Sequence, residues 1–217
     1  MLLIINYSSY KPIFKQNLSI KLSYLASLIH TKHFIYIKFM QTNLFFLIGF
    51  MASGKTSFGK KAAARLAATF WDLDAYIEET TARSIASIFE IEGEKAFREI
   101  EHNTLGSFIT FLKGKGGTHL IACGGGTPCF FNNMEMLKDA GKVIYLQHDF
   151  PILLGRLRVL QPTRPMLAKL SAEELAEFVA NLITQREPYY LQAHCIIASP
   201  NVTRLYVAIE QYLSLTV

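Results

Sequence analysis

Short apolar runs alternate with stretches of helical spacing along the chain from residue 44 onward. The apolar runs predict strands at residues 44–48, 69–72, 119–123, 142–147 and 194–198. Between them, apolar side chains at helical spacing predict helices at 54–67, 75–89, 94–112, 132–140, 152–158, 171–186 and 202–213. Because this alternation is typical of βαβ units, we expect an α/β fold with a five-stranded parallel sheet flanked by helices.

Two local signals refine this pattern. Ser171, followed three residues later by Glu174, is a capping box and predicts the start of a helix. Between residues 160 and 170, Pro162 and Pro165 interrupt the helical spacing and predict a loop.

The composition fits a folded domain, and the charge is unevenly distributed. The chain has 217 residues, of which 51% are hydrophobic and 18% charged, too apolar for a disordered protein. A net charge of +5 would favour a nucleic acid as partner. However, five of the 22 basic side chains lie in residues 1–43, which hold no acid, so the remainder carries 17 basic and 17 acidic groups. We therefore expect a small-molecule substrate, no nucleic acid, no membrane, and a monomer.

Residues 1–43 form a predicted N-terminal extension, and residues 44–217 the folded domain. Lysines interrupt the apolar runs of the extension, so no transmembrane helix is expected, and it lacks the order of a secretory signal. It is either an organelle targeting segment or precedes a true translation start at Met40, which we favour. The three cysteines lack CxxC spacing, which agrees with a reducing compartment, and we expect a cytoplasmic protein.

A phosphate-binding motif follows the first predicted strand directly. GFMASGKT, residues 49–56, matches GxxxxGK[ST] between a strand and a helix, the context in which this motif is a nucleotide site. Backbone N–H groups would cradle a triphosphate, Lys55 would reach its β- and γ-phosphates, and Thr56 would ligate Mg²⁺. The expected nucleotide-binding residues of this loop are Gly49, Ala52, Ser53, Gly54, Lys55, Thr56 and Ser57.

Two acids close the second predicted strand. In FWDLD, Asp72 and Asp74 are two positions apart, which puts them on the same side of an extended chain at the carboxyl edge of the sheet. Such a pair can divide labour, with one acid toward Mg²⁺ and one toward the hydroxyl to be phosphorylated. The alternative is an Asx turn and helix cap at Asp74. Next to a phosphate loop, we favour the catalytic interpretation.

Two arginines are candidates for an anion clamp. Arg98 lies on a predicted helix, where Glu94 and Glu101 are spaced to form ordinary surface ion pairs with it. Facing the crevice instead, Arg98 would bind an anionic substrate as a fork. Arg186, at a predicted helix end before Pro188, would complete the clamp or simply complement the helix dipole.

Two further segments are candidates for ligand contact. Gly124, Gly125 and Gly126 follow the third predicted strand, where they permit either close approach of a ligand to the backbone or a plain strand-to-helix turn. Arg164 lies in the proline-bounded loop, shortly after Arg156. A loop that carries Arg over a transferring phosphoryl group excludes water and stabilises charge, whereas the alternative is a solvated basic loop.

In their order, GFMASGKT, FWDLD, FEIEGEKAFRE, GGG, TRPML and QREPYY closely resemble the shikimate kinase family, from residue 44 to the end of the chain. The resemblance implies ATP-dependent phosphorylation of the 3-hydroxyl of shikimate, which gives ADP and 3-phosphoshikimate on the route to aromatic amino acids. It also implies a phosphate-loop kinase fold with a mobile lid.

The resemblance assigns roles on the substrate side of the site. Asp74 is similar to the residue that holds the 3-hydroxyl and helps take its proton. Arg98 and Arg186 are similar to the arginines that clamp the shikimate carboxylate, and Gly125 to a backbone contact of the ring hydroxyls.

On the nucleotide side, the resemblance assigns Asp72 as the acid near Mg²⁺. Lys55 and Arg164 would stabilise the transferring phosphoryl group, and Arg156 would stack on adenine.

Three features depart from the family pattern. Ala52 replaces the usual Gly, Met166 replaces a common Leu, and the spacing from Arg156 to Arg164 is one residue longer than expected. Ala52 is tolerable if its φ is negative, so we expect a lower nucleotide affinity rather than another activity. The alternatives are another small-molecule kinase, such as a gluconate or nucleotide kinase, and a non-catalytic nucleotide-binding module.

Overall fold

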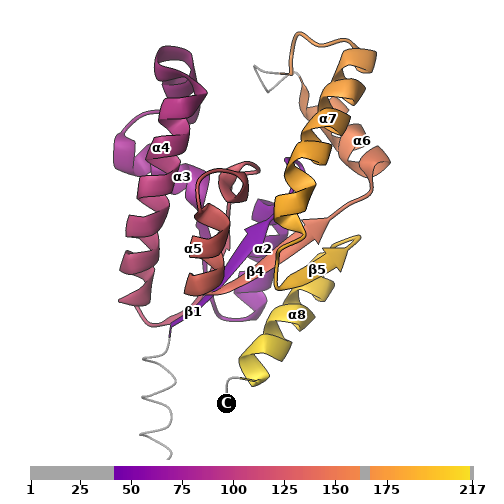
Figure 1. Ribbon diagram of the computed structural model, residues 1–217. Coiled ribbons are helices and arrows are strands. Elements are labelled where there is room, and N and C mark those ends of the chain that lie inside the picture. Colours follow the sequence, from indigo (N-terminus) through magenta and orange to yellow (C-terminus); the bar gives the residue numbers. More distant parts are fainter. Residues whose placement is uncertain (1–41, 162–166, 216–217) are drawn as a thin grey trace, which may run out of the picture. The chain divides into compact units, whose positions relative to one another are not determined.

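The chain is built around one parallel sheet. The computed structural model describes residues 42–161 and 167–215 (Figure 1). The strands β1 (Thr42–Ile48), β2 (Thr69–Asp72), β3 (Gly117–Ala122), β4 (Lys142–Gln147) and β5 (Cys195–Ala198) lie in the order β2-β3-β1-β4-β5, and all neighbouring pairs are parallel. The predicted five-stranded parallel sheet is confirmed.

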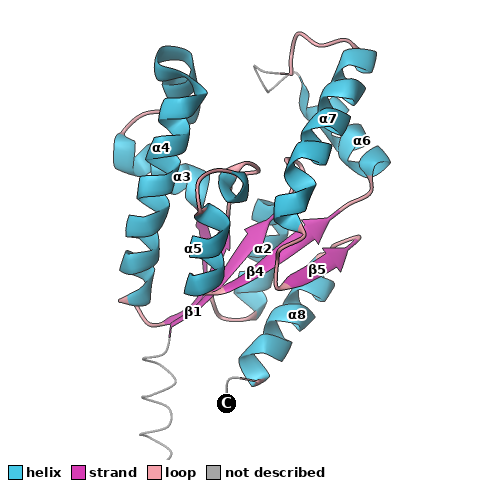
Figure 2. Ribbon diagram, viewed as in Figure 1, coloured by secondary structure: helices cyan, strands magenta, loops and turns pink. Residues whose placement is uncertain are grey.

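Helices cover both faces of the sheet (Figure 2). They are α2 (Lys55–Arg65), α3 (Leu73–Thr81), α4 (Ile85–Lys113), α5 (Asn133–Ala140), α6 (Phe150–Leu160), α7 (Ala172–Tyr190) and α8 (Val202–Ser214), with a short 3-10 helix η2 at Thr127–Cys129.

The central strand β1 contributes side chains to two hydrophobic clusters. Leu44, Phe46 and Ile48 pack with residues of α3 to α7, whereas Phe45 and Leu47 pack with residues of α2 and α8. Each of the five is at most 3% exposed. Burial on both faces explains why the strand reads as an unbroken apolar run. The same burial holds the carboxyl end of β1 in place, and the phosphate loop follows this end directly.

The predicted helix at residues 75–89 is wrong in its extent. Helix α3 begins at Leu73 and ends at Thr81, Ala82 has a left-handed φ of 52°, and Ser84 caps the next helix. The break at Ala82 could not be predicted from the sequence pattern, because Ala ordinarily favours helices. Helix α4 then kinks at Gly93 (φ 83°), so the predicted helix at 94–112 corresponds to its second part.

Helix α7 runs past its predicted end. It continues through Arg186 to Tyr190 and holds Pro188 inside it. Its start is confirmed, since Ser171 Oγ accepts from the Glu174 N–H at 3.1 Å, and the Glu174 carboxylate accepts from the Ser171 N–H at 2.7 Å. Within the described part of the chain, no helix has the length and apolar character needed to cross a membrane.

Candidate active site

The phosphate loop lies between β1 and α2. Gly49 has a φ of 139°, and a Cβ there would lie 2.8 Å from the Leu146 carbonyl oxygen, so this position requires glycine. Gly54, with a φ of 90°, turns the chain into α2. The first N–H groups of α2 have no partners within the helix, so this turn directs donors toward the loop.

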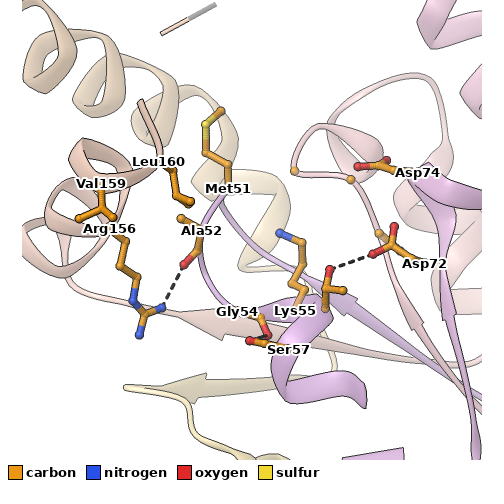
Figure 3. A pocket seen from close by; sticks show the side chains of 14 residues that line it. Met51, Ala52, Gly54, Lys55, Ser57, Asp72, Asp74, Arg156, Val159 and Leu160 are labelled. Atoms are coloured by element: carbon orange, nitrogen blue, oxygen red, sulfur yellow. Dashed lines mark hydrogen bonds between the residues drawn. The ribbon is translucent and has the colours of Figure 1, made fainter. Parts of the chain in front are cut away.

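Lys55 is folded over the loop that precedes it. Its Nζ donates to the carbonyl oxygens of Gly49 at 2.8 Å and Phe50 at 2.9 Å, and lies 3.5 Å from Oγ of the buried Ser53. These contacts hold the ammonium in the middle of the site (Figure 3).

Thr56 and Asp72 meet beside this ammonium. Thr56 Oγ1 donates to Asp72 Oδ2 at 2.8 Å, and the other carboxylate oxygen accepts from the Ala75 N–H at 3.5 Å, which caps α3. The cap considered for Asp74 therefore belongs to Asp72. The expectation of an extended chain through both acids is wrong, because β2 ends at Asp72 and Asp74 lies in the first turn of α3.

A cavity of about 550 Å³ opens above the carboxyl ends of the strands. Arg156, Val159 and Leu160 lie toward one end, and Asp72 and Asp74 lie toward the other (Figure 3). Its lining is Met51, Ala52, Gly54, Lys55, Thr56, Ser57, Asp72, Asp74, Cys123, Gly124, Gly125, Arg156, Val159 and Leu160. The two predicted acids thus share one cavity with the phosphate loop.

Asp74 has an unusual electrostatic environment in this cavity. Burial, together with the negative charges of Asp72 and Glu101, raises the pKa of Asp74 to about 6, against the opposing effect of Lys55 and Arg98. A carboxylate with a pKa close to neutral pH is well matched to accepting a proton.

The three glycines after β3 pack directly against the predicted substrate residues. A Cβ on Gly124 would lie 2.8 Å from Asp74 Oδ1, and one on Gly125 would lie 3.3 Å from Arg186 Nη1. A Cβ on Gly126 would lie 2.5 Å from Arg98 Nη2. A side chain at any of the three would press on these groups, and this loop brings together Asp74, Arg98 and Arg186 from α3, α4 and α7.

Arg98 forms both ion pairs that its spacing suggested; Glu94 is exposed, but the pair with Glu101 is buried. Nε and Nη2 donate to Glu94 Oε1 at 3.2 and 3.0 Å, and Nη1 donates to Glu101 Oε2 at 2.8 Å. Arg98 is 7% exposed and Glu101 0%. Among the described residues, these bonds leave one N–H on each terminal nitrogen, a pair suited to gripping a carboxylate.

Further contacts hold the Arg98 guanidinium in place. The Phe130 ring lies against it, with 4.2 Å from Cζ to the ring centroid. The other Glu101 oxygen accepts from Thr127 Oγ1 at 2.6 Å. Ion pairs, hydrogen bonds and an aromatic ring therefore hold the Arg98 guanidinium in one position.

Arg156 lies at the other end of the cavity, where it contacts the phosphate loop. Its Nη1 donates to the Ala52 carbonyl oxygen at 3.0 Å and lies 3.0 Å from Nε2 of His148, which is itself 3.0 Å from the Ser53 carbonyl oxygen. Burial lowers the pKa of His148, and the Arg156 charge acts in the same direction. Neutral His148 can either donate from Nε2 to the Ser53 carbonyl or accept there from Arg156, depending on its tautomer, and either contact supports the loop.

Some predictions need correction or fall outside the structure. Ala52 has a φ of 63°, so it does not adopt the negative φ under which we considered this alanine tolerable. The predicted Arg164, together with Met166 and the lid around them, lies outside the described residues.

Comparison with known proteins identifies this arrangement. Residues 51–214 match the family model for shikimate kinase. The shikimate kinase of Parabacteroides distasonis is 42% identical over 148 residues, which are 68% of this chain and 83% of the relative. That of Phocaeicola vulgatus is 40% identical over 148 residues, 68% of this chain and 82% of the relative. The chain belongs to the shikimate kinase family.

Solved structures of the shikimate kinase family agree. The crystal structure of shikimate kinase from Bacteroides thetaiotaomicron has a TM-score of 0.69 at 33% identity and covers 80% of this chain and 98% of that one. Shikimate kinase from Acinetobacter baumannii in complex with shikimate also has a TM-score of 0.69, at 30% identity, over 82% of this chain and 96% of that one. The predicted family and the phosphate-loop kinase class are confirmed.

Several residues of the site were missed in the sequence. Met51, Cys123, Val159 and Leu160 line the cavity, but their apolar character resembles that of any core residue. Tyr190, described below, lies in the quoted segment QREPYY, yet nothing in that pattern shows that its hydroxyl reaches the glycine loop.

Proposed function

We propose that this chain transfers the γ-phosphoryl group of ATP to the 3-hydroxyl of shikimate. The observation that carries the proposal is the glycine loop. Gly124 and Gly125 line the same cavity as Asp74 and the phosphate loop, and Arg186 and Arg98 pack against Gly125 and Gly126. A proton acceptor and two cations suit a small hydroxylated carboxylate, and phosphate-loop donors suit a triphosphate.

In this proposal, Arg98 and Arg186 bind the shikimate carboxylate, and the Gly125 backbone binds its ring hydroxyls. Asp74 holds the 3-hydroxyl and accepts its proton as oxygen attacks the γ-phosphorus, with ADP as leaving group. Lys55 exchanges its carbonyl contacts for phosphate oxygens, and Arg164 adds positive charge there. Positioning and charge stabilisation supply most of the rate enhancement.

Thr56 and Asp72 are the proposed Mg²⁺ residues. They offer a hydroxyl and a carboxylate whose oxygens are 2.8 Å apart. This set fits Mg²⁺, which prefers oxygen donors and commonly binds through one or two carboxylates plus phosphates. When bound, the ion would neutralise phosphate charge. Arg156 would cover the adenine.

The proposal is tested by measuring ADP release from ATP with shikimate, with gluconate and with no acceptor. We expect turnover that depends on shikimate and a 3-phosphoshikimate product. Turnover with gluconate alone would favour another small-molecule kinase. Nucleotide binding without turnover on either acceptor would favour the non-catalytic module.

A further inference from the structure

Tyr190, the last residue of α7, reaches the glycine loop. Its hydroxyl donates to the Gly125 carbonyl oxygen at 2.5 Å, and the residue is 1% exposed. Its ring packs on that of Tyr145 in β4, with centroids 5.1 Å apart. Because the ring is held by packing, the hydroxyl has a fixed position and ties the end of α7 to the loop.

Arg186 lies one helical turn before Tyr190, on the part of α7 that meets the same loop. Its Nη1 lies 3.3 Å from the position that a Cβ on Gly125 would take. Burial raises the pKa of Tyr190, so the phenol keeps the proton that it donates to the Gly125 carbonyl oxygen. The hydroxyl therefore joins the end of α7, which carries Arg186, to the Gly125 peptide.

We propose that the Tyr190 hydroxyl is a positioning group for substrate binding, which fixes the Arg186 guanidinium relative to the Gly125 peptide. This inference rests on the proposed function, in which these two groups contact the carboxylate and the ring hydroxyls of one small rigid molecule. Such a pair must be held to within about 0.5 Å to act together. Tyr190 does not itself contact the substrate; it acts through Gly125 and through Arg186, which lies on the same helix.

Tyr190→Phe tests this role because it keeps the ring and removes only the hydroxyl. We expect the shikimate KM to rise by up to about tenfold, the upper end of what losing one hydrogen bond typically costs. The ATP KM and the kcat at saturating shikimate should stay within about twofold. Tyr145→Phe is the matched control, since it removes a phenol from the neighbouring ring without touching the glycine loop. An unchanged shikimate KM in Tyr190→Phe overturns the inference.

A double-mutant comparison separates positioning from general loosening of the fold. In an Arg186→Ala background, Tyr190→Phe should raise the shikimate KM by less than about twofold more, because the group that it positions is gone. If Tyr190→Phe raises the shikimate KM by the same factor in the wild-type and Arg186→Ala backgrounds, the inference is overturned. Calorimetric titration with shikimate gives the same factors if Arg186→Ala turns over slowly. Wild-type protein without shikimate-dependent turnover contradicts the proposed function instead, whereas active wild type with a normal Tyr190→Phe contradicts only this inference.

Discussion

The carboxyl of Asp74 gives the proposed reaction a pH dependence. Its pKa is raised to about 6, chiefly by burial and the neighbouring acids. Below that pH the group is protonated and cannot accept the proton of the hydroxyl. We therefore expect kcat/KM for shikimate to fall about tenfold for each pH unit below about 6. Rates of ADP release between pH 5 and 8 measure this, and a flat profile down to pH 5 would contradict the role.

The same raised pKa has the opposite consequence for stability. A carboxyl with a pKa of about 6 when folded and 3.8 as its ordinary value favours the folded state while protonated. That contribution is full below pH 3.8 and is lost as the pH rises through 6. Asp74→Asn, which stays neutral, should thus be more stable than wild type at pH 8 by about 1 kcal/mol, a value reduced for partial solvent exposure.

Thermal unfolding followed by circular dichroism at pH 4 and pH 8 checks this prediction. The Asp74→Asn advantage should be clear at pH 8 and much smaller at pH 4, while its kcat falls by roughly a hundredfold or more. A lower Tm than wild type at pH 8 would show that the carboxylate stabilises the fold.

Ala52 carries backbone strain inside the phosphate loop. Its φ of 63° lies in the left-handed region, which costs a residue with a Cβ about 1 kcal/mol. Ala52→Gly should raise the Tm by about 2 to 4 °C and lower the ATP KM, because it also removes a methyl group beside the phosphates. Ala67→Gly is the control, since Ala67 has a φ of 50° but lies outside the cavity. An equal ATP effect in both variants would contradict the local explanation.

Local motifs predicted Lys55, Thr56 and Asp72 as site residues, because each motif fixes its own local geometry. Residues placed only by tertiary contact were not predicted. Tyr190 and His148 reach their partners 65 and 95 residues away in the chain. No local pattern encodes such a contact, so the supports of the site came only from the structure.

Helix α4 is bent before Arg98, the residue proposed to bind the substrate carboxylate. The bend is at Gly93, whose φ of 83° and ψ of 175° are essentially restricted to glycine. Gly93→Ala should cost about 1 to 3 kcal/mol, although nothing lies within 4 Å of the added Cβ, because the strain is in the backbone. The Tm should fall by about 2 to 4 °C for each kcal/mol.

Gly106→Ala in the same helix is the matched control. Gly106 is helical, and an added Cβ would lie 3.8 Å from the sulfur of Met136, an ordinary contact. This change should raise stability by up to about 1 kcal/mol, since Ala favours helices. Thermal unfolding of both variants decides the matter. A Tm rise in Gly93→Ala would show that the bend is not needed.

At the level of elements, burial determined what could be predicted. The inner strands β3, β1 and β4 are mostly buried and leave apolar runs. The edge strands β2 and β5 are less buried, yet their short apolar runs still marked them, so all five were found within a few residues of their bounds. The break at Ala82 and the passage of α7 through Pro188 were missed, because in each case tertiary packing overrides the ordinary preference of the residue.

For the whole molecule, the order β2-β3-β1-β4-β5 could not be predicted from the pattern. Five apolar strands look alike in sequence, and nothing local says which one lies at the centre. The order matters for function because it sets β1, with the phosphate loop, beside β3, with the glycine loop. These two neighbouring strands bring the phosphate loop and the glycine loop to one cavity.

The separation of residues 1–43 from the domain at 44–217 remains a prediction for the whole chain. The family match begins at residue 51, and β1 begins at Thr42. A protein that starts at Met40 lacks all five lysines of the extension and is formally neutral. We expect its kcat and shikimate KM to lie within about twofold of those of the full chain. The reason is that every residue lining the cavity lies between residues 51 and 160.

The two proteins should differ instead in their charge. At pH 7 and low salt, the full chain should be retained on a cation exchanger and the Met40 protein should pass through, because the excess of positive charge lies in the removed segment. Turnover measured on the same preparations links the two properties. A Met40 protein that fails to fold, or that loses tenfold in kcat, would show that residues 1–39 belong to the enzyme.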